Sequence, residues 1–289
     1  MSDRKSWAES LHLSNPDLTK AILARTLGFC RGSWYYQSVL ETKDKELANQ
    51  ITTTHEEEDD TLGHKKLAKI LKVNKKRVLR VMKKYNLKAR KRTNKYHYHG
   101  KSSVAQPNLA NQEEMKESLD QGIVFSDIFE FRLQDGSVVR GCFALLKQTR
   151  QILSLIFDYS MKASLVQATI DNLHWQNDLY IWHSDQGKQF GAQTTINRVI
   201  DKGLLPSMSR AGTPTDNPYA ERFVSSFKHA VVRKQQYPNL GSLLLVAEKW
   251  INFYNQRRPH ESLGQLAPNV YAQKYGWQSV PDITQLTVK

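Results

Sequence analysis

Residues 125–157 read FSDIFEFRLQDGSVVRGCFALLKQTRQILSLIF. The stretch is rich in aromatic and β-branched residues, and the pair Asp135-Gly136 separates its first two apolar runs. An Asp-Gly pair between two such runs is typical of a tight hairpin turn. We therefore predict three strands that begin a sheet, over Phe125–Leu133, Ser137–Leu146 and Gln151–Phe157.

The pattern after this hairpin alternates between helical and extended spacing. Apolar residues predict a helix over Met161–Trp175, a strand over Leu179–His183, a helix over Thr194–Lys202 and a strand over Leu204–Met208. Such an order of strands and helices predicts the α/β class, with a mixed sheet and flanking helices.

Two further helices follow this sheet. In the pair Asn217-Pro218, asparagine can cap a helix and proline can occupy its first turn, so we predict a helix from there to about Arg233. The last helix is amphipathic and ends before Arg257-Arg258-Pro259. Its apolar side contains Leu243, Val246, Ala247, Trp250, Phe253 and Tyr254.

Upstream of the sheet, the chain is strongly basic. The 289 residues contain 42 Lys and Arg against 28 Asp and Glu, a net charge of +14. Between Thr61 and Lys101 there are 16 basic residues and no acidic ones, which leaves 26 basic and 28 acidic residues elsewhere. So concentrated a positive charge repels itself unless a polyanion neutralises it, and this favours nucleic acid as a partner.

The apolar residues of the basic segment recur at helical spacing on both sides of Val73-Asn74. This predicts an all-α helix-turn-helix region whose second helix, about Lys75–Tyr85, enters a DNA groove. Five cations of this helix are the predicted DNA contacts: Lys76, Arg77, Arg80, Lys83 and Lys84.

Composition divides the chain into five parts. We predict a helical N-terminal lead-in at residues 1–40, the basic helix-turn-helix region at 41–95 and a linker at 96–121, which carries Pro107 and several Asn and Gln. The catalytic core would then occupy residues 122–236, and a helical extension residues 237–289.

Cysteine usage and hydropathy exclude several classes of protein. Cys30 and Cys142 are the two cysteines, and they form no CxxC motif, so a disulfide scaffold or a zinc knuckle is not expected. The longest strongly apolar run, Ile152–Phe157, is too short to span a bilayer. We expect no signal peptide and no membrane helix, and a reducing cytosolic compartment.

Three acids lie on separate predicted elements: Asp127 on the first strand, Asp185 just after the fourth, and Glu221 in the first turn of the capped helix. If these carboxylates converge, they repel one another unless hard divalent cations neutralise them. Mg²⁺ suits such oxygen ligands, and two ions suit an in-line displacement at phosphorus. The pattern predicts a nuclease or a strand-transfer enzyme.

Three motifs strengthen this interpretation: His183-Ser184-Asp185-Gln186-Gly187, then Thr213-Pro214-Thr215-Asp216-Asn217-Pro218-Tyr219-Ala220-Glu221, and Tyr254-Asn255-Gln256-Arg257-Arg258-Pro259-His260. In this order, with 35 residues between Asp185 and Glu221, they resemble the catalytic core of bacterial insertion-sequence transposases related to retroviral integrases. That resemblance implies an RNase H-like fold and an Asp-Asp-Glu site. The segment around Asp127 departs from the family pattern, since Phe125-Ser126 stands where Trp and Thr are usual.

By this resemblance, Asp127, Asp185 and Glu221 hold two Mg²⁺ (or Mn²⁺) ions and catalyse end cleavage followed by strand transfer. Lys228, two helical turns after Glu221, is expected to contact a DNA phosphate beside the ions, or else to lie on the surface. His183 either supports the site from behind or simply packs. Arg257 and Arg258 either hold DNA or cap the last helix.

The resemblance extends to the basic region and is of the two-frame type, with this chain as the second-frame, OrfB-like product. It implies a first-frame, OrfA-like partner, double-stranded DNA at element ends and target, a homo-multimer on DNA, and a bacterial cytoplasmic, nucleoid-associated location. Two alternatives stay open: a catalytically silent DNA-binding regulator, and an RNase H-like nuclease without joining activity.

Overall fold

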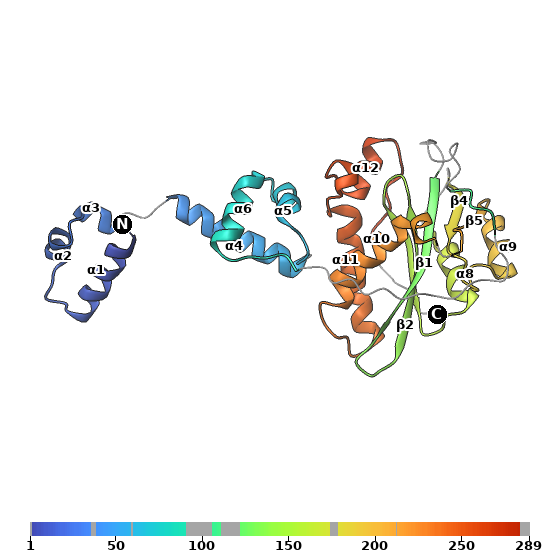
Figure 1. The fold of residues 1–289 in the computed structure, drawn as a ribbon, viewed down its shortest axis with the longest axis horizontal. Helices are drawn as coiled ribbons and strands as arrows, with labels where there is room; N and C mark the ends of the chain where they lie inside the picture. The colour runs from blue at the N-terminus through green and yellow to red at the C-terminus, as the bar shows by residue number, and fades with distance from the viewer. Residues whose placement is uncertain are drawn as a thin grey trace. The chain divides into compact units, whose positions relative to one another are not determined.

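A computed structural model describes residues 2–35, 39–58, 60–90, 106–110, 122–173, 179–211 and 213–283 (Figure 1). The chain divides into two compact units, Met1–Gln50 and Ile51–Lys289. The division falls within helix α4, Val39–Glu57, which the sequence pattern did not predict. No described helix has the length and hydropathy needed to cross a membrane.

The first unit is a small helical assembly. It contains α1 (Ser2–Ser14), α2 (Lys20–Thr26), α3 (Arg31–Tyr35) and the beginning of α4. Thr19 caps α2 by accepting a hydrogen bond from the Ile22 amide. Its buried core consists of Ala8, Leu23 and Ala24. The helical character expected for the N-terminal lead-in is present.

The basic segment of the second unit forms two helices joined by a tight turn. Helix α5 covers His64–Ile70 and α6 covers Lys75–Lys84. The Asn74 side chain caps α6 by accepting the Lys76 amide at 2.9 Å. Leu67, Val78 and Val81 are buried between the helices. The two helices and their turn lie where predicted, while Lys91, Arg92, Lys95 and Lys101 fall outside the described residues.

The sheet has five strands in the order β3-β2-β1-β4-β5. They are β1 (Gly122–Arg132), β2 (Val138–Leu146), β3 (Ile152–Asp158), β4 (Leu179–Ser184) and β5 (Leu205–Met208). The first three form an antiparallel meander through the predicted Asp135-Gly136 turn, whereas β4 and β5 run parallel to β1. Such a mixed sheet, with helices on both faces, is an RNase H-like core, as expected.

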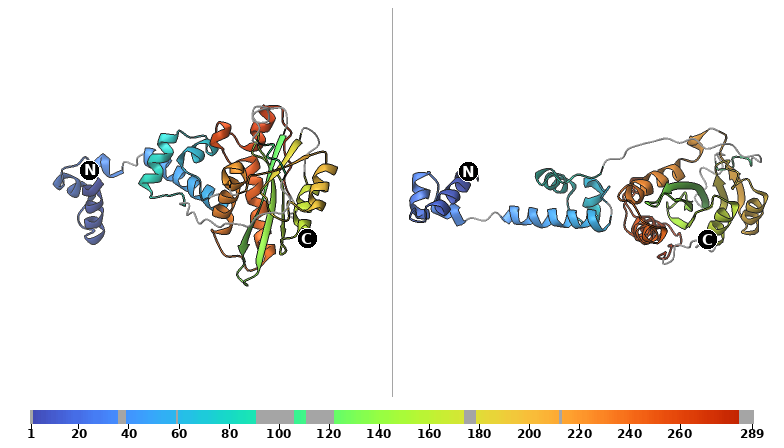
Figure 2. Two further views of the ribbon diagram at one scale, coloured as in Figure 1. Left: turned by 45° about the vertical axis from the view of Figure 1, so that its right-hand side comes forward. Right: turned by 90° about the horizontal axis from the view of Figure 1, so that it is seen from below.

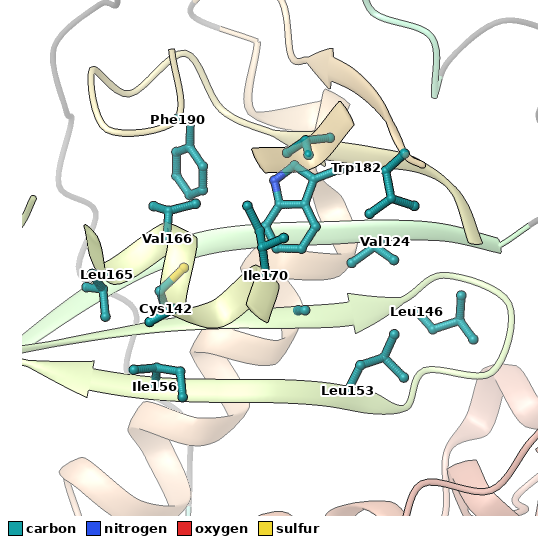
Figure 3. Packing of buried hydrophobic residues seen from close by; sticks show 14 of the residues in the cluster. Val124, Cys142, Leu146, Leu153, Ile156, Leu165, Val166, Ile170, Trp182 and Phe190 are labelled. Carbon is teal, nitrogen blue, oxygen red and sulfur yellow. The ribbon is translucent and has the colours of Figure 1, made fainter. Parts of the chain in front are cut away.

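One face of the sheet packs against α8 (Ala163–Asp171) and α9 (Gln193–Asp201). Val124, Cys142 and Trp182 on the strands meet Leu165 and Ile170 of α8 (Figure 3). Helix α8 ends at Asp171, earlier than predicted, and Trp175 lies outside the described residues.

The opposite face is aromatic and lies under α10 (Pro218–Phe227) and α11 (Leu240–Gln256) (Figure 2). Phe129 of β1 packs on Phe227, and Phe143 of β2 packs on Phe223, with ring centroids 5.1 and 4.4 Å apart. Trp250 of α11 contacts both α10 rings. The predicted C-terminal extension therefore shares this hydrophobic core.

Shorter elements complete the second unit. They are the 3₁₀ turns η1 (Pro214–Asp216) and η3 (Glu261–Leu263), the π-helical turn η2 (Lys228–Val232) and helix α12 (Pro268–Lys274). The helix predicted to run to Arg233 is therefore interrupted, since α10 becomes a π-turn at Lys228. Turns of this kind are frequent at functional sites.

Part of the predicted linker packs against the sheet. The Leu109 amide donates to the Ser207 hydroxyl of β5 at 2.9 Å, and the Met208 amide donates to the Pro107 carbonyl at 3.3 Å. Asn108 donates to the Asp216 carboxylate at 2.9 Å. Residues 106–110 are thus held at the edge of the sheet, while 96–105 and 111–121 lie outside the described residues.

Candidate active site

Strand register places Asp127 beside Asp185. Strands β1 and β4 are parallel neighbours, and Phe125 pairs with His183. Asp127 and Asp185 each lie two residues further along, so they are adjacent where β4 ends. Side chains alternate along a strand, and Asp127 therefore faces α10 together with Phe125 and Phe129. Phe125 packs on Tyr219 of α10 at 5.0 Å.

The Asp127 carboxyl lies in an unfavourable place for a charge. Its pKa is raised to about 7, chiefly by burial, then by the neighbouring Asp185, with a smaller contribution from Glu221. Two effects oppose this increase: the Ile128 amide donates to Oδ1 at 2.7 Å, and Lys228 provides a positive charge nearby. The site is thus short of positive charge at neutral pH.

Asp185 is fixed by the loop that follows β4. The Gly187 amide donates to Asp185 Oδ1 at 2.9 Å. A side chain at position 187 would place its Cβ 3.0 Å from the same oxygen and 2.8 Å from the Gln189 amide nitrogen. A larger residue at position 187 would therefore require the Gln189 side chain or the Asp185 carboxylate to shift.

Glu221 lies in the first turn of α10 and is exposed. Partial desolvation raises its pKa. No three of the described His, Cys, Asp and Glu residues are close enough together to hold a metal ion as they stand. An exposed glutamate can change rotamer at little cost, so Glu221 is able to move toward the two aspartates without disturbing the core.

Asn217 is the N-cap residue of α10, as predicted, and it also joins the start of this helix to β1. Its side chain makes no capping bond to the helix. Instead, Nδ2 donates to the Ser126 carbonyl at 3.2 Å, directly before Asp127. The predicted N-cap position is therefore correct, but the side chain bonds to a buried strand carbonyl, a partner that local sequence does not reveal. Pro218 does occupy the first turn, as predicted.

Lys228 is half-buried at the start of the π-turn. Its positive charge is close enough to Asp127 to lower the pKa of that carboxyl. Burial lowers the pKa of Lys228 itself, while Asp127 and then Glu130 act in the opposite direction. The Lys228 ammonium can therefore compensate part of the negative charge at Asp127, and it can also bind an anionic ligand.

His183 is fully buried behind Asp185. Its Nδ1 lies 2.8 Å from the Ser207 hydroxyl and its Nε2 lies 3.0 Å from the Ser209 hydroxyl. Burial lowers the pKa of the imidazole to about 4, so it is neutral at physiological pH. The ring joins β4 to β5 below the carboxylates, and its position fits a supporting role and excludes direct contact with a substrate.

Asp216 is a structural residue of this site that sequence reasoning missed. It forms a salt bridge with Arg210, with Nε and Oδ2 3.0 Å apart, and it also accepts from Asn108. The hydrogen bond from Arg210 lowers the pKa of Asp216 to about 2. These interactions hold the two ends of the loop between β5 and α10 together. Asp216 belongs to the second sequence motif, where it directly precedes Asn217, and this position could have indicated its structural role.

The predicted DNA-binding cations differ in where they lie. Lys76, Arg80, Lys83 and Lys84 are exposed on α6, and Arg77 is half-buried. Arg257 is exposed and pairs with Glu58. Arg258 is only 2% exposed, contacts Thr61 Oγ1 at 3.5 Å and lies 5.7 Å above the Trp250 ring. A guanidinium so deeply buried is out of reach of a DNA phosphate. The predicted DNA contact of Arg258 is therefore not supported, and the side chain packs inside the protein.

Two family models match the second unit. Residues 119–214 match an integrase core domain, and residues 202–268 match a further integrase core domain model. The two ranges overlap and together cover Asp127, Asp185, Glu221 and Arg258.

Sequence relatives come from bacterial insertion elements. The putative transposase InsK for insertion sequence element IS150 of Escherichia coli is 25% identical over 266 residues, which cover 86% of this chain and 92% of that protein. An uncharacterized 31.7 kDa protein of insertion element IS407 from Burkholderia multivorans is 25% identical over 128 residues, 44% of this chain. The match spans less than half, 46%, of that relative's length.

Among solved structures, the catalytic core domain of BIV integrase is similar in fold. It covers 53% of this chain and 95% of its own length, with a TM-score of 0.42 and 15% sequence identity.

Proposed function

We propose that this chain, which matches integrase core domain models at residues 119–214 and 202–268, is the transposase of a bacterial insertion sequence and an Asp-Asp-Glu polynucleotidyl transferase. The observation that supports this most strongly is the pair of carboxylates that the parallel strands β1 and β4 bring together where β4 ends. Asp127 and Asp185 lie side by side, and both burial and mutual repulsion raise the pKa of Asp127. The fold maintains a destabilising arrangement, which is typical of a functional site.

The donor set fits divalent cations. Asp127, Asp185 and Glu221 would hold two Mg²⁺ ions, or Mn²⁺, because these hard ions prefer carboxylate oxygens. When bound, the ions would stabilise the charge on the attacking and leaving oxygens at phosphorus. A cation would be stabilised most by Asp127, since Lys228 alone compensates only part of the negative charge around this carboxyl. Glu221 completes the set by a change of rotamer.

The reaction requires two displacements at one site. In the first, water hydrolyses a phosphodiester at an element end and leaves a free 3′-hydroxyl. In the second, this hydroxyl attacks a phosphodiester of the target, whose own 3′-oxygen leaves. Lys228 holds a phosphate of the DNA beside the carboxylates. His183 keeps β4 and β5 in register below Asp185 through Ser207 and Ser209.

The α5–α6 pair provides the second DNA contact. The exposed cations of α6, with Lys76, Arg80 and Lys83 among them, meet backbone phosphates at an element end. Because two ends must be brought together, the active form is a multimer on DNA. A first-frame, OrfA-like protein of the same element and a bacterial cytoplasmic, nucleoid-associated location complete the proposal.

The test is a labelled duplex carrying the element's own ends, incubated with Mg²⁺ and either the wild-type protein or Asp185→Asn. We expect nicked and joined products from the wild type alone. Asp201→Asn is the matched control, since Asp201 is an exposed acid at the end of α9. Nicking without joining would identify a nuclease. Binding without either product, with the first-frame partner present, would identify a silent DNA-binding regulator and overturn the proposal.

A further inference from the structure

Three aromatic rings connect the elements that carry the candidate carboxylates. Each ring stands two residues before one of the acids: Phe125 before Asp127, His183 before Asp185, and Tyr219 before Glu221. The Phe125 ring centroid lies 5.0 Å from the centroid of His183 and 5.0 Å from that of Tyr219. The three rings therefore form one continuous layer across β1, β4 and α10, with Phe125 in the middle.

The rings of this layer are buried to different extents. Phe125 and His183 are almost completely buried, and the imidazole is held between the hydroxyls of Ser207 and Ser209. Tyr219 is only half-buried. The sheet thus fixes two of the rings, whereas the position of the third depends on the groups that contact it.

Arg150 contacts the Tyr219 ring from the turn between β2 and β3. Its guanidinium carbon lies 4.2 Å from the centre of the ring, within the range of about 6 Å at which a cation is attracted to an aromatic face. The Arg150 amide donates to the Leu146 carbonyl at 2.8 Å, and the backbone has φ 62°, which is uncommon for residues other than glycine. Such backbone strain is frequent at functional sites.

The first turn of α10 is attached to β1 at two points. Asn217 donates to the Ser126 carbonyl, and Tyr219 packs on Phe125. Because Glu221 belongs to the same turn, these contacts determine where its backbone lies relative to β1. The exposed Glu221 side chain can then approach the aspartates by a change of rotamer alone.

We propose that Arg150 and Tyr219 are positioning residues that hold Glu221 where it can join Asp127 and Asp185 in binding a divalent cation. The inference rests on the proposed function for the role of the three carboxylates. Arg150 holds the Tyr219 ring, and the ring holds the first turn of α10 against β1. Loss of either side chain should weaken metal binding through Glu221 and leave the two aspartates in place.

The first experiment measures the melting temperature of the protein without DNA at increasing concentrations of Mg²⁺. The disruptive variants are Tyr219→Leu and Arg150→Asn, and the conservative ones are Tyr219→Phe and Arg150→Lys. Asparagine tolerates a positive φ, so Arg150→Asn removes the guanidinium without adding backbone strain. The melting temperature without metal shows that each variant folds, and Arg150→Asn tests the same contacts should Tyr219→Leu fail to fold.

Tyr275→Leu is the matched control. Tyr275 also contacts one cation and one ring, since the Lys274 Nζ atom lies 5.3 Å from its ring centre and the Tyr271 ring 4.4 Å away. It directly follows α12 and is 54% exposed. This variant therefore loses the same two kinds of contact outside α10 and the sheet.

We expect Tyr219→Leu to raise the Mg²⁺ concentration for half-maximal stabilisation by about tenfold, as residues that orient metal ligands typically do, and Arg150→Asn by a smaller factor. Tyr219→Phe and Arg150→Lys keep the ring and the cation and should stay close to the wild type. Tyr275→Leu should leave this concentration unchanged. In a Glu221→Gln background, Tyr219→Leu should have no further effect, because it acts through Glu221. An equal effect in both backgrounds would overturn the inference.

The second experiment separates this inference from the proposed function by measuring cleavage and joining of the labelled element-end duplex. If the wild type binds Mg²⁺ and cuts DNA, but Tyr219→Leu and Arg150→Asn keep its Mg²⁺ dependence, the inference is overturned and the proposed function stands. If the wild type shows the expected Mg²⁺ binding and coupling but produces neither product, the positioning role stands and the proposed function is rejected. A wild type that neither Mg²⁺ nor Mn²⁺ stabilises would overturn both.

Discussion

The carboxylate edge of the sheet and helix α6 carry opposite charges, and the fold holds these charges in different ways. The negative charge at the sheet edge comes from two residues, Asp127 and Asp185, whose positions are fixed by the register of β1 and β4. The two carboxylates repel each other in a partly buried environment. The cations of α6 are several and largely exposed on one surface. Coupled buried charges act as a unit, whereas exposed charges contribute small and nearly additive amounts. Removal of one acid should therefore abolish a function that removal of one cation only weakens.

The largest effect is expected from Asp127→Asn. The amide keeps an oxygen that can accept the Ile128 amide, so the fold should persist. It loses the negative charge that a divalent cation needs, and we expect cleavage and joining to fall by about a thousandfold or more. Initial rates on the element-end duplex in Mg²⁺ measure this loss, and DNA affinity should stay within a few-fold of the wild type. A variant with more than about a tenth of wild-type activity would mean that Asp127 is not a metal ligand.

A smaller loss is expected from Asn217→Ala, which removes the bond between α10 and the Ser126 carbonyl. Residues that orient metal ligands typically contribute about 10- to 100-fold to activity. Because Glu221 would be held less firmly, we expect the Mg²⁺ concentration for half-maximal activity to rise. Activity titrated with Mg²⁺ distinguishes this from simple destabilisation.

The matched control for that experiment is Asn172→Ala. Asn172 also donates to a backbone carbonyl, that of Ala168 at 2.8 Å, but at the end of α8 on the other face of the sheet. Both variants lose one such hydrogen bond, which costs about 1 kcal/mol or somewhat more when the carbonyl is left buried. If Asn217→Ala and Asn172→Ala both reach half-maximal activity at the same Mg²⁺ concentration as the wild type, Asn217 has no positioning role.

The basic region should respond gradually. Lys76→Gln and Lys83→Gln on α6 are each expected to weaken DNA binding several-fold and to reduce the salt slope by about 0.9, with additive effects in the double variant. Anisotropy measured at several salt concentrations tests this, with Lys202→Gln, directly after α9, as the control. A slope that does not change in the double variant would remove α6 from the DNA contact.

Much of the fold was predictable because it depends on local periodicity. The Asp135-Gly136 turn, the alternation along β1 and the spacing of apolar residues in α6 are properties of neighbouring residues, and these elements lie where the pattern places them. The sequence also allows Asp127, Asp185 and Glu221 to converge from separate elements, and the register of β1 and β4 brings the two aspartates together where β4 ends.

What sequence could not reveal depends on contacts between distant segments. Asn217 stands at the predicted N-cap of α10, yet its side chain bonds to the Ser126 carbonyl of β1 and not to the helix. The sequence predicts Arg258 either as a DNA contact or as a cap of the last helix, yet its side chain is buried beside Trp250 and Thr61. Positive charge predicts exposure on average, and tertiary packing overrides this where aromatic and hydroxyl groups accept the guanidinium.

The smallest expected effect is a difference in pH dependence of thermal stability between the wild type and Asp127→Asn, both without metal. The folded protein holds the pKa of Asp127 at about 7, above its ordinary value of 3.8. Folded molecules therefore bind more protons than unfolded ones between these values, and stability is lost as pH rises through this window. The asparagine variant has no such loss.

Other groups act in the opposite direction within the same range. Burial lowers the pKa of His183 to about 4, so its contribution to stability increases as pH rises toward its ordinary value of 6.5. This contribution is present in both proteins and cancels in the difference between them. We therefore expect the two melting temperatures to be similar near pH 4 and the variant to be more stable by several degrees near pH 7.5. A constant difference across this range would show that the Asp127 carboxyl is not strained by burial and by Asp185. Addition of Mg²⁺ at the higher pH should stabilise the wild type and close the gap, because the ion provides the positive charge that the asparagine variant no longer requires.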